Sequence, residues 1–111
     1  MPSIMRKISK FTKREIDYLF RHARRIAKNQ ACTILVAPRQ NADFGRVLII
    51  ASRKVGNAPE RNLIRRRIKS IFYEEKLFNL GFDCVVIAYR GMASLSFDEI
   101  KTLILSAYQK L

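Results

Sequence analysis

Residues 53–69 read RKVGNAPERNLIRRRIK, and this stretch does most to decide the fold. Asn57 followed by Glu60 has the spacing of a capping box at a helix start, and Pro59 suits the first turn. Isoleucines then recur at positions 64, 68 and 71, which is the spacing of one helical face. We therefore expect a helix over about residues 58–77 whose isoleucine face packs on a core.

The same stretch carries seven cations against one anion, Glu60. Solvated helix faces usually mix charges of both signs, whereas here no further acidic residue occurs before Glu74 and Glu75. Such a density of positive charge repels itself and indicates a polyanionic partner. Arginine outnumbers lysine, which favours folded RNA over a membrane surface, because guanidinium groups bind phosphate in pairs of hydrogen bonds and stack on bases. The side chains expected to face the RNA are Arg53, Lys54, Asn57, Arg61, Asn62, Arg65, Arg66, Arg67 and Lys69.

The composition of the whole chain agrees with this interpretation. The 111 residues include 22 Lys and Arg against 9 Asp and Glu, a formal net charge of +13. A hydrophobic fraction of 49% excludes a disordered basic tail and, at this length, predicts a single domain over residues 1–111. No apolar run approaches the roughly 18–20 residues that span a bilayer. Cys32 and Cys84 lie far apart in apolar runs, so we expect reduced core cysteines of a cytoplasmic protein.

Two further helices and three strands are expected from the rest of the sequence. Capping boxes that begin at Thr12 and Ser96 predict helices over about 12–28 and 96–110. Runs rich in Val and Ile predict strands over about 31–37, 47–51 and 84–89. Turn residues at 39–45 suggest that the first two strands form a hairpin, and Gly81 could end the basic helix. The order α-β-β-α-β-α predicts an α+β sandwich.

The segment Ser52–Phe72 resembles the signature of the bacterial ribonuclease P protein subunit, which has a basic pair, a Gly/Asn turn and then Arg-Asn-Arg on a helix. The matching positions are Arg53, Lys54, Gly56, Asn57, Ala58, Arg61, Asn62, Ile64, Arg65, Arg66, Ile68, Lys69 and Phe72. This resemblance implies a subunit that binds a large catalytic RNA, ribonuclease P RNA. The holoenzyme would cleave the 5′ leader from precursor tRNA, with hydrolysis and the required magnesium belonging to the RNA.

The resemblance also implies a fold and a second site. The fold is a two-layer sandwich, α-β-β-(β)-α-β-α, with a mostly antiparallel sheet and a left-handed β-α-β crossover, against the usual right-handed preference. A cleft between the first helix and the sheet would receive the single-stranded leader, lined here by Ile16, Phe20, Ile34 and Val36. Ile16 and Ile34 stand where the family often has aromatic residues, so less stacking of leader bases is expected.

One member of the motif differs from the family pattern, since Leu63 stands in place of its second arginine. Arg67 lies one turn further along and could supply a cation nearby. No catalytic side chains are expected in the chain itself. His22 is the only histidine, and no Ser-His-Asp arrangement, metal-ligand set or paired carboxylates can be argued. A structural RNA-binding protein of the ribosomal type and a helix that reads duplex DNA remain alternatives, although the DNA reader lacks base-reading side chains beyond Asn62.

Overall fold

The computed structural model describes residues 3–111 and confirms all three predicted helix starts. The helices are α2 (Lys13–His22), α3 (Ala58–Glu74) and α4 (Phe97–Tyr108). At each start, the side chain of Thr12, Asn57 or Ser96 accepts a hydrogen bond from the backbone N–H of the glutamate three residues on. The glutamate carboxylate accepts one in return from the N–H of the capping residue. These local bonds satisfy donors that a helix otherwise leaves free, so the start positions follow from sequence.

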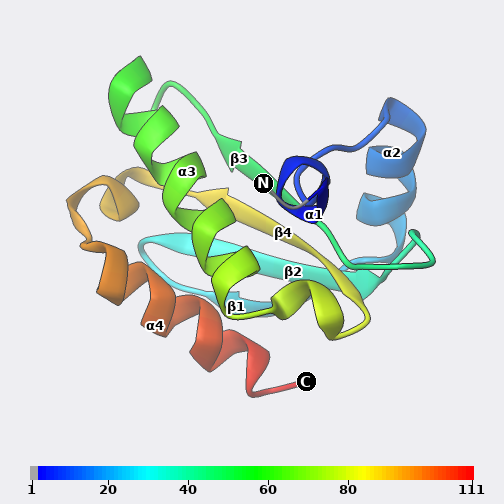
Figure 1. The fold of residues 1–111 in the computed structure, drawn as a ribbon. Helices are drawn as coiled ribbons and strands as arrows, with labels where there is room; N and C mark the ends of the chain where they lie inside the picture. The colour runs from blue at the N-terminus through cyan, green and yellow to red at the C-terminus, as the bar shows by residue number, and fades with distance from the viewer. Residues whose placement is uncertain (1–2) are drawn as a thin grey trace.

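Four strands form one mixed sheet in the order β1-β2-β4-β3. They are β1 (Arg24–Lys28), β2 (Cys32–Pro38), β3 (Val47–Ala51) and β4 (Phe82–Ala88). The β1–β2 and β2–β4 pairs are antiparallel, whereas β3 and β4 are parallel and are connected through α3. In Figure 1, α3 lies in front of the sheet, and β3 and β4 both run towards the left of the view, with β4 below β3. An observer who faces along the strands with α3 overhead therefore has β4 on the left of β3. The β3–α3–β4 crossover is therefore left-handed, as the resemblance implies.

The predicted first helix, 12–28, is wrong in its second half. Helix α2 ends at His22, and Ala23 is already extended, with φ −74° and ψ 142°. The following residues form the edge strand β1, in which Ile26 is buried. A tight turn joins β1 to β2, where the side chain of Asn29 accepts hydrogen bonds from the N–H groups of Ala31 and Cys32. Ala23 and Ala27 match a helical spacing, but pairing with β2 decides the structure.

The hairpin predicted between the first two expected strands, which are β2 and β3 of the structure, is also wrong. The segment 39–45 does connect β2 to β3, but β4 lies between these strands in the sheet.

The basic helix is also shorter than predicted. It ends at Glu74, and Lys76 adopts the left-handed conformation with φ 56°, after which a short 3₁₀ helix runs over Leu77–Asn79. Gly81, with φ 81°, serves the turn into β4 and does not end α3.

Two further short elements, besides β1 and the 3₁₀ helix at Leu77–Asn79, were not predicted: the N-terminal helix α1 (Ser3–Lys7) and the 3₁₀ helix η2 (Arg90–Ser94). Residues 1 and 2 of the predicted domain lie outside the part that the structure describes.

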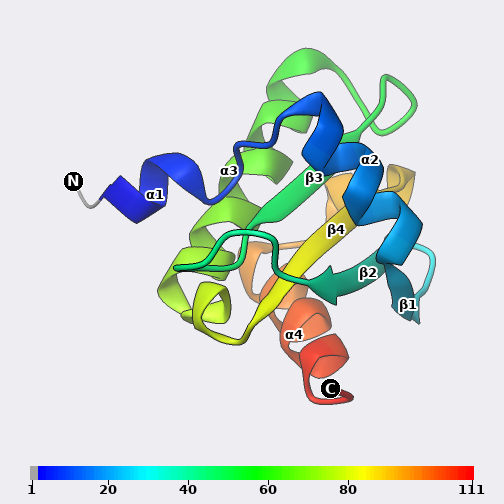
Figure 2. The same ribbon diagram turned by 90° about the vertical axis from the view of Figure 1, so that its right-hand side faces the viewer.

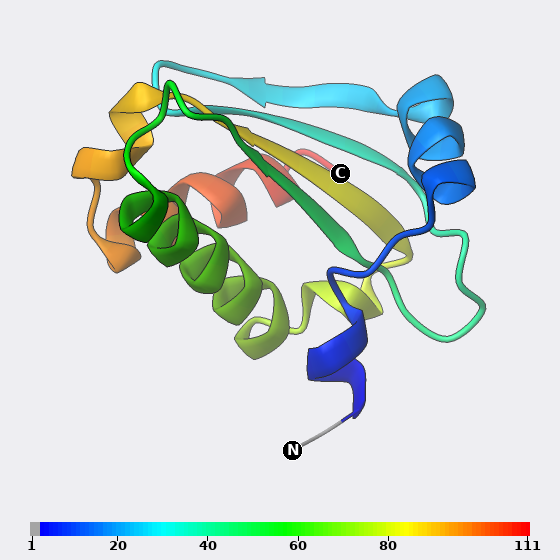
Figure 3. The same ribbon diagram turned by 90° about the horizontal axis from the view of Figure 1, so that it is seen from above.

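Helices cover the two faces of the sheet unequally. One face packs against α3 and α4 in a large core that includes Ile34, Val36, Ile64 and Ile104. On the other face, a second, smaller cluster forms where Leu19 of α2 packs on the sheet, and α2 lies at one end of the strands (Figures 2 and 3). Much of this second face therefore stays free of helices.

Both cysteines are free and buried, as predicted for reduced core residues. Burial raises the pKa of Cys32 to about 11 and that of Cys84 to about 12. Both thiols are therefore protonated and unreactive in the folded protein.

The guanidinium of Arg46 fastens α2 and the segment before it to the end of the sheet. Its Nη2 lies 2.8 Å from Glu15 Oε2, and its Nη1 donates to the backbone oxygen of Lys10 at 3.0 Å. The guanidinium also lies 4.4 Å from the ring centroid of Phe11. Below it, the buried carboxylate of Asp83 accepts from the N–H of Arg46 at 2.9 Å. The placement of α2 thus depends on a buried charged group.

This arrangement predicts how stability responds to acid. The hydrogen bond from Arg46, together with that from the Thr12 N–H, lowers the pKa of Glu15 from 4.5 to about 2. A lowered pKa in the folded state stabilises the fold above pH 4.5, and this contribution is lost as the pH falls towards 2. The unfolding free energy of Glu15→Gln should therefore fall less than that of the wild type as the pH is lowered from 4.5 to about 2.

The measurement is urea unfolding of both proteins at neutral pH and at several values between 4.5 and 2. Burial is the main cause that raises the pKa of Asp83, so the contribution of Asp83 has the opposite sign. The negative charge of Glu15 is the smallest of the causes, so Glu15→Gln changes this contribution only slightly. Parallel pH profiles for the two proteins would contradict the role assigned to the Arg46–Glu15 pair.

Candidate nucleic-acid interface

The exposed side of α3 carries most of the predicted cations. Asn62, Arg65 and Arg66 are exposed, while Arg61 and Lys69 are half-buried at its margins. The opposite side presents Ile64, Ile68, Ile71 and Phe72 to the core, where all four are buried. The isoleucine spacing therefore fixes the helix on the sheet and leaves the arginines pointing outwards.

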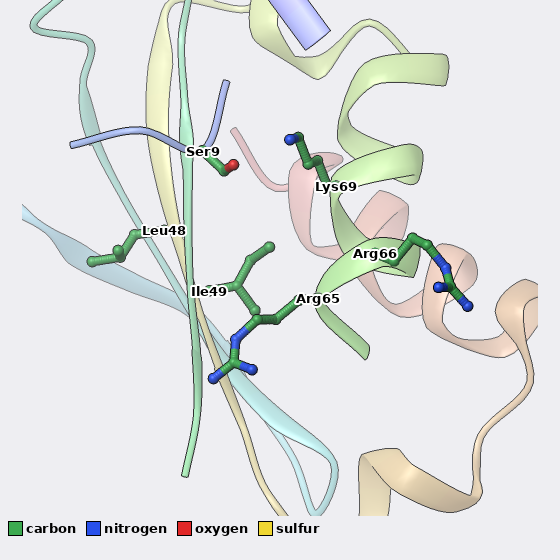
Figure 4. Close-up of a pocket in the computed structure, with 6 residues that line it drawn as sticks. All are labelled: Ser9, Leu48, Ile49, Arg65, Arg66 and Lys69. Atoms are coloured by element: carbon green, nitrogen blue, oxygen red, sulfur yellow. The ribbon is translucent and has the colours of Figure 1, made fainter. Parts of the chain in front are cut away.

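A hollow of about 520 Å³ lies between α3 and the free edge of β3. It is lined by Ser9, Leu48, Ile49, Arg65, Arg66 and Lys69. In Figure 4, the Arg65 guanidinium lies beside Ile49 and Lys69 points towards Ser9, whereas Arg66 points away from β3. The hollow combines an apolar floor with cations from a single helix. It could accept a phosphate backbone along its rim.

Arg65 is held in place by the protein itself. Its Nη2 donates to the backbone oxygen of Ala51 at 3.1 Å, and its Nη1 lies 3.3 Å from Asn62 Oδ1. These neutral acceptors orient the guanidinium without cancelling its charge. Asn62, which the sequence places inside the motif, thus positions an arginine at the end of β3.

Arg67 is placed apart from the other cations. Its Nη1 donates to the backbone oxygen of Leu95 at 3.1 Å, on the side of α3 that faces η2 and α4. The suggestion that it replaces the cation missing at Leu63 finds no support in this geometry, and Leu63 itself is half-buried. Arg67 ties two helical segments together, so a contact between it and RNA stays an unsupported prediction.

A second basic hollow, of about 550 Å³, lies at the N-terminal end of α3. Arg53, Lys54 and Gly56 come from the turn after β3, and Arg90 comes from η2. A Cβ on Gly56 would lie 2.8 Å from the carboxylate of Glu60 in the capping box, so a side chain there would disturb this helix start. Sequence analysis missed Arg90 because it is a single cation far from the motif. The tertiary fold brings it beside Lys54, whose backbone oxygen lies 3.4 Å from Arg90 Nε.

Few of these charges are neutralised within the protein. In the described part of the chain, the ion pairs are Arg46–Glu15 and Lys101–Glu75, the latter at 3.5 Å. Neither involves a cation of the predicted RNA-binding set. Arg61 Nε is buried and has no acceptor among residues 3–111. The cations of this set therefore repel one another, and an external polyanion would relieve that repulsion.

The open face of the sheet differs from the predicted leader cleft. Ile34 and Val36 are 0% and 1% exposed and belong to the core under α3 and α4. Because side chains alternate along a strand, the residues of β2 that face α2 are Leu35 and Ala37. The prediction of Ile34 and Val36 is therefore wrong: this strand is apolar on both faces, and its sequence does not show which face is open. The open face carries Leu35, Ala37, Leu48, Ile50, Val85 and Ile87.

The two residues predicted on α2 remain accessible. Phe20 is 43% exposed and lies outside both core clusters, and Ile16 is half-buried. The rings of Tyr18 and His22 contact each other, with centroids 4.2 Å apart and planes tilted by 37°. Phe20 is thus free to contact a ligand beside the open face.

The described side chains offer no arrangement suited to the magnesium that the resemblance implies. Within residues 3–111, no group of three or more His, Cys, Asp or Glu lies close enough together to bind a metal ion. The best-placed carboxylates are already engaged, since Glu15 binds Arg46 and Asp83 accepts from the N–H groups of Gln40 and Arg46. These residues do not fit a magnesium site.

None of the helices described is long and apolar enough to cross a membrane. An α+β fold with unpaired arginines along one helix and an open apolar sheet face defines a basic RNA-binding protein. Comparison with known proteins identifies the family within this class. A model of the family described as "Ribonuclease P" matches residues 5–111. The chain belongs to the ribonuclease P protein family, and is thus a subunit of an endoribonuclease that matures tRNA.

Individual relatives agree over most of their length. The ribonuclease P protein component of Petrotoga mobilis is 34% identical over 104 residues, which cover 89% of this chain and 86% of that protein. The component from Streptococcus agalactiae is 30% identical over 88 residues, 79% of each chain. Among solved structures, the Staphylococcus aureus RNase P protein superposes with a TM-score of 0.78 at 22% identity, covering 92% of this chain and 93% of that one. The Thermotoga maritima protein gives 0.76 at 22% identity, with 93% and 96% covered. These two structures support the fold.

The two faces of β2 lead to a testable difference. Ile34→Ala removes a fully buried side chain and should lower the free energy of unfolding by about 2–5 kcal/mol. Leu35→Ala, its neighbour on the open face, should cost clearly less, because Leu35 is only half-buried. Denaturant unfolding of both variants measures this difference, and an equal loss would contradict the assignment of the open face.

Proposed function

We propose that the exposed side of α3 and the turn before it bind ribonuclease P RNA. The unpaired cations of this surface carry the proposal. Arg53, Lys54, Arg61, Arg65, Arg66 and Lys69 would bind phosphates, with Asn57 and Asn62 supporting the helix start and Arg65. Phosphate contacts of this kind release counterions and give affinity without reading sequence.

We further propose that the open sheet face beside α2 receives the single-stranded 5′ leader of precursor tRNA. Unpaired bases expose apolar faces, which can lie on Phe20, Ile16 and the half-buried aliphatic residues Leu35 and Ile87. A duplex hides these base faces and would gain little from such a surface. Because Ile16 is aliphatic, part of the contact is apolar packing in place of aromatic stacking.

In this proposal, phosphodiester hydrolysis and the magnesium that it requires belong to the RNA. The protein contributes by offsetting repulsion between the phosphates of the leader and the RNA, and by holding the leader. This would lower the magnesium concentration that the RNA needs. The complex would work in the cytoplasm, which suits two free, buried cysteines.

The alternative of a structural RNA-binding protein without a role in turnover shares the basic α3 surface. It gives no reason for an open apolar face beside an accessible Phe20, so that face favours the leader-binding proposal. A duplex DNA reader is disfavoured because the exposed side of α3 offers arginines and lysine but few base-reading amides.

Salt dependence tests the RNA-binding surface. Arg66→Ala removes an exposed cation, so the slope of log affinity against log salt for the catalytic RNA should fall by about 0.7–0.9 for one lost phosphate contact. Lys101→Ala removes the same charge from α4 and serves as the matched control, with no expected change in slope. Equal effects of both substitutions on filter-binding curves would argue for net charge alone and against a defined surface.

Cleavage tests the function directly. A bacterial ribonuclease P RNA is incubated with a leader-bearing precursor tRNA at low magnesium, with and without this chain. The chain should restore accurate 5′ cleavage, and the double variant Arg65→Ala/Arg66→Ala should not, provided that its unfolding midpoint is preserved. Tight RNA binding with unchanged cleavage would support the structural alternative. Stronger binding to duplex DNA than to structured RNA would overturn both.

A further inference from the structure

Strand β3 lies at one edge of the sheet, so half of its backbone groups face no other strand among residues 3–111. The N–H of Cys84 donates to the backbone oxygen of Arg46 at 2.8 Å, just before β3 begins. In a parallel pair, every second residue of a strand bonds to its neighbour, so the even-numbered residues of β3 bond to β4. The N–H and C=O groups that point to the open edge belong to Val47, Ile49 and Ala51.

The two ends of this open edge are already occupied. The N–H of Val47 donates to the backbone oxygen of Ile8 at 2.6 Å, and the oxygen of Ala51 accepts from Arg65 Nη2 at 3.1 Å. The backbone groups of Ile49 lie between these contacts, beside the hollow of about 520 Å³ that separates β3 from α3. The middle of the edge therefore offers a donor and an acceptor to a further strand.

The charges beside the open edge indicate which kind of strand fits. In Figure 4, the Arg65 guanidinium lies beside Ile49 and Lys69 points towards Ser9, so both cations are on the side of α3. Among residues 3–111, none of those that line the hollow is acidic. The side chains of an added strand alternate between two faces, so every second one would face these cations. Acidic residues at alternate positions complement them.

A second copy of this chain and a nucleic acid both fit the edge less well. Pairing of two β3 edges would bring Arg65 and Lys69 of both copies together, and each copy has a formal net charge of +13. The phosphates of a nucleic acid would satisfy the cations, but they accept hydrogen bonds and donate none to the C=O of Ile49. A peptide backbone supplies donors and acceptors at the repeat of a strand.

We propose that the open edge of β3 binds an extended, acidic segment of a partner protein, which adds a fifth strand to the sheet beside α3. The backbone of the segment pairs with Ile49, and its acidic side chains at alternate positions bind Arg65 and Lys69. These two cations also belong to the surface proposed above for ribonuclease P RNA, so the segment and the RNA exclude each other. That exclusion rests on the proposed function, whereas the strand pairing does not.

The probe is a short, blocked peptide of alternating valine and glutamate, added to the full-length chain labelled with ¹⁵N. In the free protein, the amide proton of Ile49 should exchange with solvent faster than that of Ile50, which bonds to β4. With the peptide at ten times its dissociation constant, exchange at Ile49 should slow about 10-fold. The same peptide with every backbone nitrogen methylated keeps its charges but loses its donors, and should bind at least about 10-fold more weakly.

A pair of variants tests the contact from the side of the protein. Ile49→Pro removes the N–H at the edge without breaking a hydrogen bond to β4, and proline is tolerated on edge strands. It should abolish peptide binding and leave the affinity for ribonuclease P RNA unchanged. Ile49→Ala keeps the N–H and is the matched control, so it should still bind the peptide. Should Ile49→Pro lower the unfolding midpoint, the exchange data on the wild-type chain decide the question.

The outcomes separate this inference from the proposed function. Failure of the unmodified peptide to bind, or binding that leaves exchange at Ile49 unchanged, would overturn the strand pairing. Equal affinity of the methylated and unmethylated peptides would reduce the contact to charge alone and would overturn it as well. If the peptide protects Ile49 but does not displace ribonuclease P RNA, the pairing stands and the assignment of Arg65 and Lys69 to the RNA is wrong.

Discussion

The buried guanidinium of Arg46 is the contact on which the arrangement of this protein depends. It joins Lys10, Glu15 and Phe11, which precede or begin α2, to a strand end that Asp83 also holds. A charge that is 5% exposed is tolerable only when it is paired, so the segment that supplies Glu15 must stay at this place. Helix α2 is thereby confined to one end of the sheet. The open apolar face follows from that confinement.

Charge is distributed to match this geometry. Eight of the 22 Lys and Arg residues lie on α3, in the turn before it or at Arg90. Four of the nine acidic residues, Glu74, Glu75, Asp98 and Glu99, lie at the end of α3 and the start of α4. A polyanion is therefore drawn to the side of β3 and kept away from α4. The hollow with Arg65 and the open face of the sheet both adjoin β3. The free edge strand β3 thus separates the basic hollow beside α3 from the open apolar face of the sheet.

A structural feature could be predicted from the sequence when the hydrogen bonds that form it join residues close together in the chain. Helix starts at Thr12, Asn57 and Ser96 were predictable because each capping box is closed within four residues. The strand at 24–28 was not, because its hydrogen bonds come from β2 and its spacing also suits a helix. The order of the strands in the sheet could not be predicted either, because β4 lies between β2 and β3 through pairings with residues distant in the sequence. The basic motif could be recognised from local sequence, whereas Arg90 joins the basic hollow only through the tertiary fold.

The two kinds of contact proposed here explain how one small protein could serve many precursor tRNAs. In this proposal, phosphate contacts on α3 carry no information about bases, and stacking on Phe20 accepts any unpaired base. What both surfaces recognise is a backbone that is single-stranded in one region and held by folded RNA in another. Specificity then comes from the distance between the two surfaces and from their fixed orientation about β3. The rigid Arg46 contact that places α2 is for this reason as important to recognition as the arginines themselves.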